Sequence, residues 1–238
     1  MNKNIELLMP IKATPYEHQK KAFAFACDKF GVFDNQLKSR GTALLMEMGT
    51  GKTIVSIAVS GCMYQYGKIN RVLVVAPLSI LGVWEEEFAK FADFPYSLAI
   101  LKGTVAKKKE QLTKLPEEGL QVVVVNYESA WRLEKELLAY NPDLVIADEA
   151  HKLKENRSKQ SQGMQHIGDK AKYKLLLTGT VITNRELDVF SQYRFLNPQI
   201  FGMSFYAFCN RYFDMGGYGN HTLIFRKWTM DDFLKKLH

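Results

Sequence analysis

Cysteine is scarce in this sequence, and long apolar runs are missing from it. The three cysteines, Cys27, Cys62 and Cys209, are far apart and form no Cys-x-x-Cys pair. This spacing argues against a disulfide framework and against a cysteine-based zinc site. The amino terminus has no apolar signal core, and no apolar run approaches the roughly 18 residues that a membrane helix needs. We therefore expect an intracellular, cytoplasmic protein without a membrane partner.

Charge is plentiful but unbalanced. The 238 residues include 32 Lys and Arg against 25 Asp and Glu, which gives a net charge of +7. Such an excess favours polyanionic partners, nucleic acid above all. The excess lies in three clusters, and the alternative for each is a set of solvated lysines on a helix surface. We prefer this alternative for the first cluster along the chain and leave it open for the second. The clusters lie at residues 107–109, 152–159 and 170–174.

The most informative motif is Gly49-Thr50-Gly51-Lys52-Thr53, preceded by Met48. A glycine-rich turn that opens a helix can direct backbone N–H groups at phosphate oxygens, so ATP is the expected ligand. Lys52 would reach the β- and γ-phosphates, and Thr53 would offer its hydroxyl to Mg²⁺. The strict P-loop pattern has glycine where this chain has Met46, so a strand-to-helix turn without a ligand remains the alternative. An apolar strand at 42–46 and an apolar helical pattern at 54–66 favour the P-loop.

A second motif places two carboxylates at the end of another apolar run. Residues 143–149 form a strand-like apolar run that ends in Asp148 and Glu149. Ligands of parallel sheets bind beyond the carboxyl ends of the strands, where the phosphate loop also lies. Asp148 suits the metal, through a bound water, and Glu149 suits the attacking water, so both are catalytic candidates with Lys52. Alternatively, the pair caps the following helix.

Apolar strand patterns alternate with helical patterns, which predicts a parallel α/β sheet. We expect strands at 43–46, 71–76, 96–101, 121–126, 144–148 and 173–178, with crossover helices at 80–91, 105–115 and 129–139. We assign residues 1–13 to a lead-in, 14–197 to the nucleotide-binding domain and 198–238 to a short helical extension that is rich in aromatic residues.

Six sequence blocks in this order resemble the first motor domain of superfamily 2 helicases and translocases, and most of all the Swi/Snf-type DNA translocases. The resemblance covers nearly the whole chain and includes a DEAH box. It implies a RecA-like three-layer α/β fold and an ATP hydrolase that moves on duplex DNA. The blocks are Pro15-Tyr16-Glu17-His18-Gln19, Glu47-Met48-Gly49-Thr50-Gly51-Lys52-Thr53, Val75-Ala76-Pro77-Leu78-Ser79-Ile80-Leu81 with Trp84, Asn126-Tyr127-Glu128, Asp148-Glu149-Ala150-His151, and Leu177-Thr178-Gly179-Thr180 followed by Asn184.

The resemblance also implies roles for single residues. Gln19 would read the adenine edge, because an amide donates and accepts at once. A larger group would contact nucleic acid or couple it to the nucleotide site: Pro77, Leu78, Ser79, Asn126, Tyr127, His151, Thr178 and Thr180. For most of these residues an ordinary turn or surface position is the competing interpretation. His151 has no second His or Cys at ligand spacing, so we do not expect it to bind a metal.

The sequence departs from the family pattern at three positions. Met46, Thr50 and Val181 replace the usual Asp, Leu and Pro. The family also needs a second motor domain whose arginines face the γ-phosphate, so we expect this chain to be half of a motor and to have that domain as its partner. Two other interpretations stay open: a strand-separating or restriction-type helicase motor, and an ATP-regulated nucleic-acid-binding module that does not hydrolyse ATP.

Overall fold

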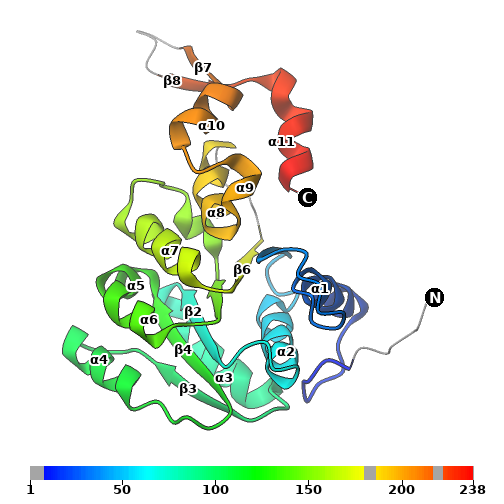
Figure 1. The fold of residues 1–238 in the computed structure, drawn as a ribbon, viewed down its shortest axis with the longest axis vertical. Coiled ribbons are helices and arrows are strands. Elements are labelled where there is room, and N and C mark those ends of the chain that lie inside the picture. The colour runs from blue at the N-terminus through cyan, green and yellow to red at the C-terminus, as the bar shows by residue number, and fades with distance from the viewer. Residues whose placement is uncertain (1–7, 180–185, 217–221, 238) are drawn as a thin grey trace.

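A parallel sheet forms the centre of the molecule (Figure 1). The computed structural model describes residues 8–179, 186–216 and 222–237. The sheet within these ranges has six strands in the order β1-β6-β5-β2-β4-β3, and every neighbouring pair is parallel. The strands are β1 (Gly41–Leu45), β2 (Arg71–Ala76), β3 (Tyr96–Ile100), β4 (Leu120–Asn126), β5 (Leu144–Ala147) and β6 (Tyr173–Thr178).

Helices cover both faces of this sheet, which gives the three layers expected from the sequence. In β2, Val72 and Val74 belong to one apolar core and Leu73 and Val75 to the other, because successive side chains point to opposite faces. One core is covered by α1 (Glu17–Lys29), α2 (Lys52–Gln65) and α3 (Leu81–Phe91), and the other by α5 (Tyr127–Arg132), α6 (Glu134–Tyr140), α7 (Lys159–Lys170) and α8 (Val189–Leu196), while α4 (Val105–Thr113) contacts β3.

The expected bounds of the six strands are within two residues of the observed ones, but one helix was predicted wrongly. The segment 129–139 reads as one crossover helix in sequence, whereas the structure has two helices that meet at Leu133. There the backbone has φ −104° and ψ 18°, outside the helical range. Leu133 and Leu137 are both buried in the core on this face of the sheet, so the two short helices cover the sheet together.

The carboxyl-terminal extension stacks on α8, away from β3 (Figure 1). Its aromatic cluster centres on Phe208, whose ring packs against Phe190 of α8 and against Phe201, Tyr212 and Phe233 at centroid distances of 5.1–6.5 Å. The extension is not purely helical, since two strands pair as an antiparallel hairpin. Its elements are α9 (Pro198–Phe201), α10 (Phe205–Tyr212), β7 (Phe213–Gly216), β8 (Thr222–Phe225) and α11 (Met230–Leu237).

Both expected domain boundaries stay predictions. The extension shares its aromatic cluster with α8, so a division after residue 197 crosses packed rings. In the lead-in, Met9 and Ile11 are buried against the core, and Ile11 pairs with Ala92 at the end of α3. Within residues 8–179, 186–216 and 222–237, no helix has the length and apolar character needed to cross a membrane.

Candidate nucleotide site

The loop between β1 and α2 has the backbone conformation of a phosphate-binding turn. Gly49 and Gly51 have φ values of +78° and +93°, which side-chain-bearing residues rarely adopt. Gly51 is the N-cap of α2, so the helix starts at Lys52 with its free N–H groups facing the loop. A Cβ added to Gly49 would meet no atom within 4 Å, and Met48 beside it is 82% exposed. The outer side of the loop is therefore open to a ligand.

Lys52 lies inside this loop. Its side chain is buried, and its Nζ donates to the backbone carbonyls of Met46 at 3.1 Å and Glu47 at 3.2 Å. Two neutral carbonyls hold the ammonium group in the turn without neutralising it. Thr53, one residue further along α2, is half-buried. The sequence motif thus places a buried cation, the Lys52 ammonium, at the positive amino-terminal end of α2.

Helix α1 holds the loop from the other side through Gln19. This side chain is 6% exposed; its Nε2 donates to Thr50 O at 3.1 Å, and its Oε1 accepts from Tyr16 N at 3.0 Å. After these two bonds, the Gln19 side chain still has a second hydrogen on Nε2 and a second lone pair on Oε1. His18 Nε2 also lies 2.9 Å from Thr50 O. Gln19 therefore contacts the loop directly, and its role in reading adenine stays a proposal.

The acidic pair directly follows β5. Asp148 is 4% exposed; its Oδ2 accepts from Trp84 Nε1 and its Oδ1 from the backbone N–H of Glu149, both at 2.9 Å. Glu149 has φ +48° and ψ +53°, a left-handed conformation that costs a non-glycine residue about 1–2 kcal/mol. Its Oε2 lies 3.2 Å from His151 Nδ1. Backbone strain of this kind concentrates at functional sites.

The loop and the acidic pair share one edge of the sheet. Strand β6 lies between β1 and β5, and Thr178 at its end is opposite Leu45. The backbone N–H of Met46 donates to Thr178 O at 3.2 Å. Thr178 is thus located between the two motifs, and its coupling role stays a proposal. Thr180, the second candidate of this block, lies outside the described residues.

Electrostatics also connect the two motifs. Burial raises the pKa of Asp148 above its usual range, and the nearby charge of Glu149 adds to this shift. The Trp84 hydrogen bond and the positive charge of Lys52 act in the opposite direction. Lys52 is therefore close enough to influence the Asp148 carboxylate.

Two aromatic residues support the acidic pair, and sequence reasoning assigned neither of them this role. Trp84 on α3 is 1% exposed and donates its indole N–H to Asp148. Tyr127 is 4% exposed and donates its hydroxyl to Asp148 O at 2.7 Å, so its ring lies beneath the acidic motif and not on the surface. Burial raises the pKa of Tyr127 well above its usual range, so it remains a donor. For Trp84, the sequence signal that could have indicated burial was its position on the apolar face of the predicted helix.

The other candidates for nucleic-acid contact lie where β2 and β4 end. Leu78 is 72% exposed, Ser79 is exposed, and Pro77 and Asn126 are half-buried. Leu78 and Asn126 line a cavity of about 480 Å³, whose basic lining residues are Lys102, Lys108 and Arg132. These groups share the sheet edge of the P-loop. The described part of the chain has no cluster of three or more His, Cys, Asp or Glu side chains that could hold a metal ion, and His151 pairs with Glu149 instead.

Comparison with known proteins identifies relatives of this chain. The SNF2-related domain family matches residues 16–215. "Switch 2" of Arabidopsis thaliana is 31% identical over 199 residues, which are 78% of this chain and 22% of that protein. A "DNA repair and recombination protein RAD54-like" of Drosophila ananassae is 29% identical over 204 residues, covering 79% and 24%. The chain thus spans about a quarter of the length of these relatives.

Solved structures show the same likeness. The Sulfolobus solfataricus SWI2/SNF2 ATPase core in complex with dsDNA superposes with a TM-score of 0.72 and 31% identity, over 87% of this chain and 41% of that one. The ATPase core domain of the same organism gives 0.67 and 28%, over 88% and 40%. The RecA-like fold inferred from the motifs is therefore confirmed. With a family match over most of its length, the chain belongs to the SNF2-related domain family, as part of a Swi/Snf-like superfamily 2 motor.

Proposed function

We propose that this chain is the ATP-binding half of an ATP-dependent motor that moves on duplex DNA. One observation carries the proposal. A buried lysine in a glycine turn and an acidic pair with a strained backbone at Glu149 occupy the same sheet edge, with Thr178 between them. A nucleotide held by Lys52 would have its γ-phosphate near Glu149. The solved relative in complex with dsDNA supports the choice of duplex DNA as the track.

The residues present fit ATP with Mg²⁺. The positive φ and open surroundings of Gly49 allow close approach of a polyphosphate, and the Lys52 ammonium lies within the turn. Thr53 and Asp148 supply a hydroxyl and a carboxylate, the oxygen donors that Mg²⁺ prefers. When bound there, through Thr53 directly and Asp148 through water, Mg²⁺ would neutralise charge on the β- and γ-phosphates.

The protein groups would divide the remaining work. Lys52 would exchange its bonds to Met46 O and Glu47 O for phosphate oxygens, which accept more strongly than neutral carbonyls. Glu149 would orient the attacking water through its carboxylate, which is 21% exposed and paired with His151. Trp84 would hold Asp148 in one orientation.

Nucleic acid would bind along the same edge, beyond β2 and β4. Pro77, Leu78, Ser79 and Asn126 provide backbone and small polar groups, which suit contacts to phosphates and sugars. Binding would then be independent of sequence and sensitive to salt. His151 and Thr178 would transmit the nucleotide state to this surface.

Fast turnover would need a second motor domain. An arginine supplied across an interface accelerates phosphoryl transfer by about 10³–10⁵. Arg194, which lies on α8, is bonded through both its terminal nitrogens to Asp169 at 2.8–2.9 Å and is not available for that task. We therefore propose that a second motor domain closes on this site.

Hydrolysis assays on two proteins test this function. Phosphate release is measured with and without duplex DNA, on this chain and on a protein that also carries the second motor domain. We expect slow turnover by this chain, DNA-stimulated turnover by the two-domain protein, and loss of that turnover in Glu149→Gln. ATP binding without turnover in the two-domain protein would show a binding module instead of a motor. Equal stimulated turnover by both proteins would refute the need for a second domain.

A further inference from the structure

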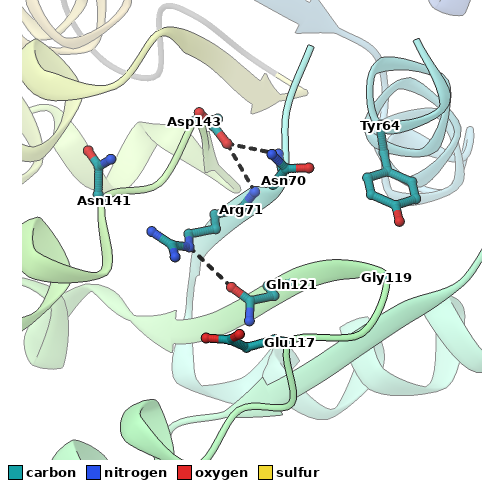
Figure 2. A pocket seen from close by; sticks show the side chains of 8 residues that line it. All are labelled: Tyr64, Asn70, Arg71, Glu117, Gly119, Gln121, Asn141 and Asp143. Carbon is teal, nitrogen blue, oxygen red and sulfur yellow. Dashed lines mark hydrogen bonds between the residues drawn. The ribbon is translucent and has the colours of Figure 1, made fainter. Parts of the chain in front are cut away.

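Two polar cavities lie at the amino-terminal edge of the sheet, opposite the nucleotide site. Figure 2 shows the first, where the polar groups bind one another. Asp143 accepts from the backbone N–H groups of Asn70 and Arg71, and its other oxygen pairs with Lys172 at 2.7 Å. Arg71 in turn donates to Gln121 Oε1 at 3.1 Å. These side chains are occupied in holding three strands together.

The second cavity, of about 410 Å³, contains a buried cation that has no hydrogen-bond or ion-pair partner among the described residues. It lies between the segment before β1, the end of α7, the start of β6 and the turn from α8 to α9. Lys174 of β6 lines it and is 6% exposed. Its ammonium group makes no hydrogen bond or ion pair with any residue in the described part of the chain. A buried charge normally has a partner, so this one is a specific signal for a ligand.

The charges around Lys174 leave a positive excess. The cavity is lined by four charged residues: Lys38, Arg40, Asp169 and Lys174. Lys38 pairs with Asp28 of α1 and with Asp34 of its own loop, and Asp169 is bonded by both terminal nitrogens of Arg194. Arg40 is exposed and, among the described residues, its guanidinium has no ion pair. Arg40 and Lys174 are thus two cations without an ion-pair partner in the described part of the chain, and they are adjacent because Lys174 N donates to Arg40 O at 2.7 Å.

Neutral groups complete the cavity. Asn197, at the turn from α8 to α9, accepts from Gln199 N at 3.0 Å through Oδ1, which leaves its NH₂ group free to donate. Gly168 gives room to the Phe195 ring and to the stem of Lys174, because a Cβ there would lie 2.8 Å from the ring and 3.3 Å from Lys174 Cδ. Two cations and an amide donor are the groups that recognise tetrahedral oxoanions.

We propose that this cavity binds a phosphate-bearing small molecule, with Lys174 and Arg40 as the phosphate ligands and Asn197 as a further donor. The cavity volume is in the range of small-molecule sites and exceeds what inorganic phosphate alone fills, which favours a phosphate monoester. The ligand would tie α9, the first helix of the extension, to β1 and β6. This site is separate from the P-loop and does not depend on the proposed motor function.

The electrostatic state of Lys174 agrees with an anion site. Burial, with the charges of Arg194 and Arg40, lowers the pKa of Lys174 to about 8, while Asp169 acts in the opposite direction. A bound phosphate would favour the charged ammonium and restore its pKa toward the usual range.

Calorimetric titration of this chain tests the proposal. The Lys52→Ala background removes phosphate binding at the P-loop. Glycerol 3-phosphate and inorganic phosphate are the probes, and sodium chloride at matched ionic strength is the control. We expect the monoester to bind and to raise the melting temperature. Lys174→Met and Arg40→Gln should each weaken it by roughly ten- to hundredfold, as for charged hydrogen bonds. Lys170→Gln removes a neighbouring charge outside the cavity and should have no effect.

Amine acetylation adds a test that needs no variant at Lys174. At pH 8, the monoester should slow acetylation of Lys174, read by mass spectrometry, and leave Lys170 unchanged. Tighter binding of inorganic phosphate than of the monoester would support the site with free phosphate as its ligand. Equal effects of sodium chloride and the monoester, or unaltered affinity in a folded Lys174→Met variant, would overturn the proposal.

Discussion

Replacing Lys174 by Met should stabilise the protein at neutral pH, and the gain should shrink as the pH rises. The pKa of Lys174 is about 8 in the folded protein and 10.5 at its usual value. The folded state therefore binds fewer protons than the unfolded state between these values, so stability rises with pH across this window. Each pKa unit corresponds to about 1.4 kcal/mol, so keeping Lys174 charged at pH 7 costs up to about 3 kcal/mol.

Urea unfolding at pH 7 and pH 9, in buffer free of phosphate and sulfate, measures this effect. By linkage the parent should gain about 1.3 kcal/mol relative to Lys174→Met over this interval. Other titrating groups are common to both proteins and cancel in the difference. Lys170→Met, at an exposed neighbouring position, should follow the parent. Parallel pH profiles for the parent and Lys174→Met would show that Lys174 has an ordinary pKa, and the reasoning would fail.

Three further predictions concern the nucleotide edge. Gly51→Ala should weaken Mg·ATP binding by at least about tenfold, because its Cβ would lie 2.3 Å from Gln19 Nε2 at a φ of +93°. Gly67→Ala, at φ +66° with no atom within 4 Å of the new Cβ, is the matched control. It should keep ATP binding in calorimetry, and its free energy of unfolding should fall only by the roughly 1–2 kcal/mol that a left-handed backbone costs alanine. Trp84→Phe should destabilise the fold by about 1.5–3 kcal/mol in urea unfolding and raise the pKa of Asp148 further, because the carboxylate loses its indole donor; an unchanged unfolding midpoint would contradict this. Duplex DNA should bind without sequence preference and weaken steeply with salt in fluorescence anisotropy, and a strong preference between two unrelated duplexes at physiological salt would argue against a translocase.

The sheet was predictable because its strands are buried on both faces and read as continuous apolar runs. The glycine turn before α2 and the acidic pair after β5 could be picked out in the sequence because the chemistry proposed for them needs particular residues at fixed spacing. Their meeting at one edge followed from the rule that parallel strands end together. The break at Leu133 was not predictable, because both halves of 129–139 have helical patterns and only packing decides where the chain bends.

Other features depended on contacts between distant residues. The bond from Trp84 to Asp148 joins residues 64 positions apart, and no spacing rule encodes it. Tyr127 matched a surface motif, but its hydroxyl binds a backbone carbonyl in the interior. The unpaired state of Lys174 is visible only when the neighbouring charges are known. Local pattern therefore gave the elements and the motifs, whereas tertiary packing decided which side chains support them.

Binding of Mg·ATP to this chain, followed by calorimetry, tests the central claim most directly. The parent should bind with a stoichiometry of about one, as expected for a single P-loop. Lys52→Ala should lose most of this affinity because Lys52 contacts the phosphates, whereas Glu149→Gln should retain it because Glu149 positions water. Equal affinity of the parent and Lys52→Ala would contradict the assignment of the loop after β1 as the nucleotide site.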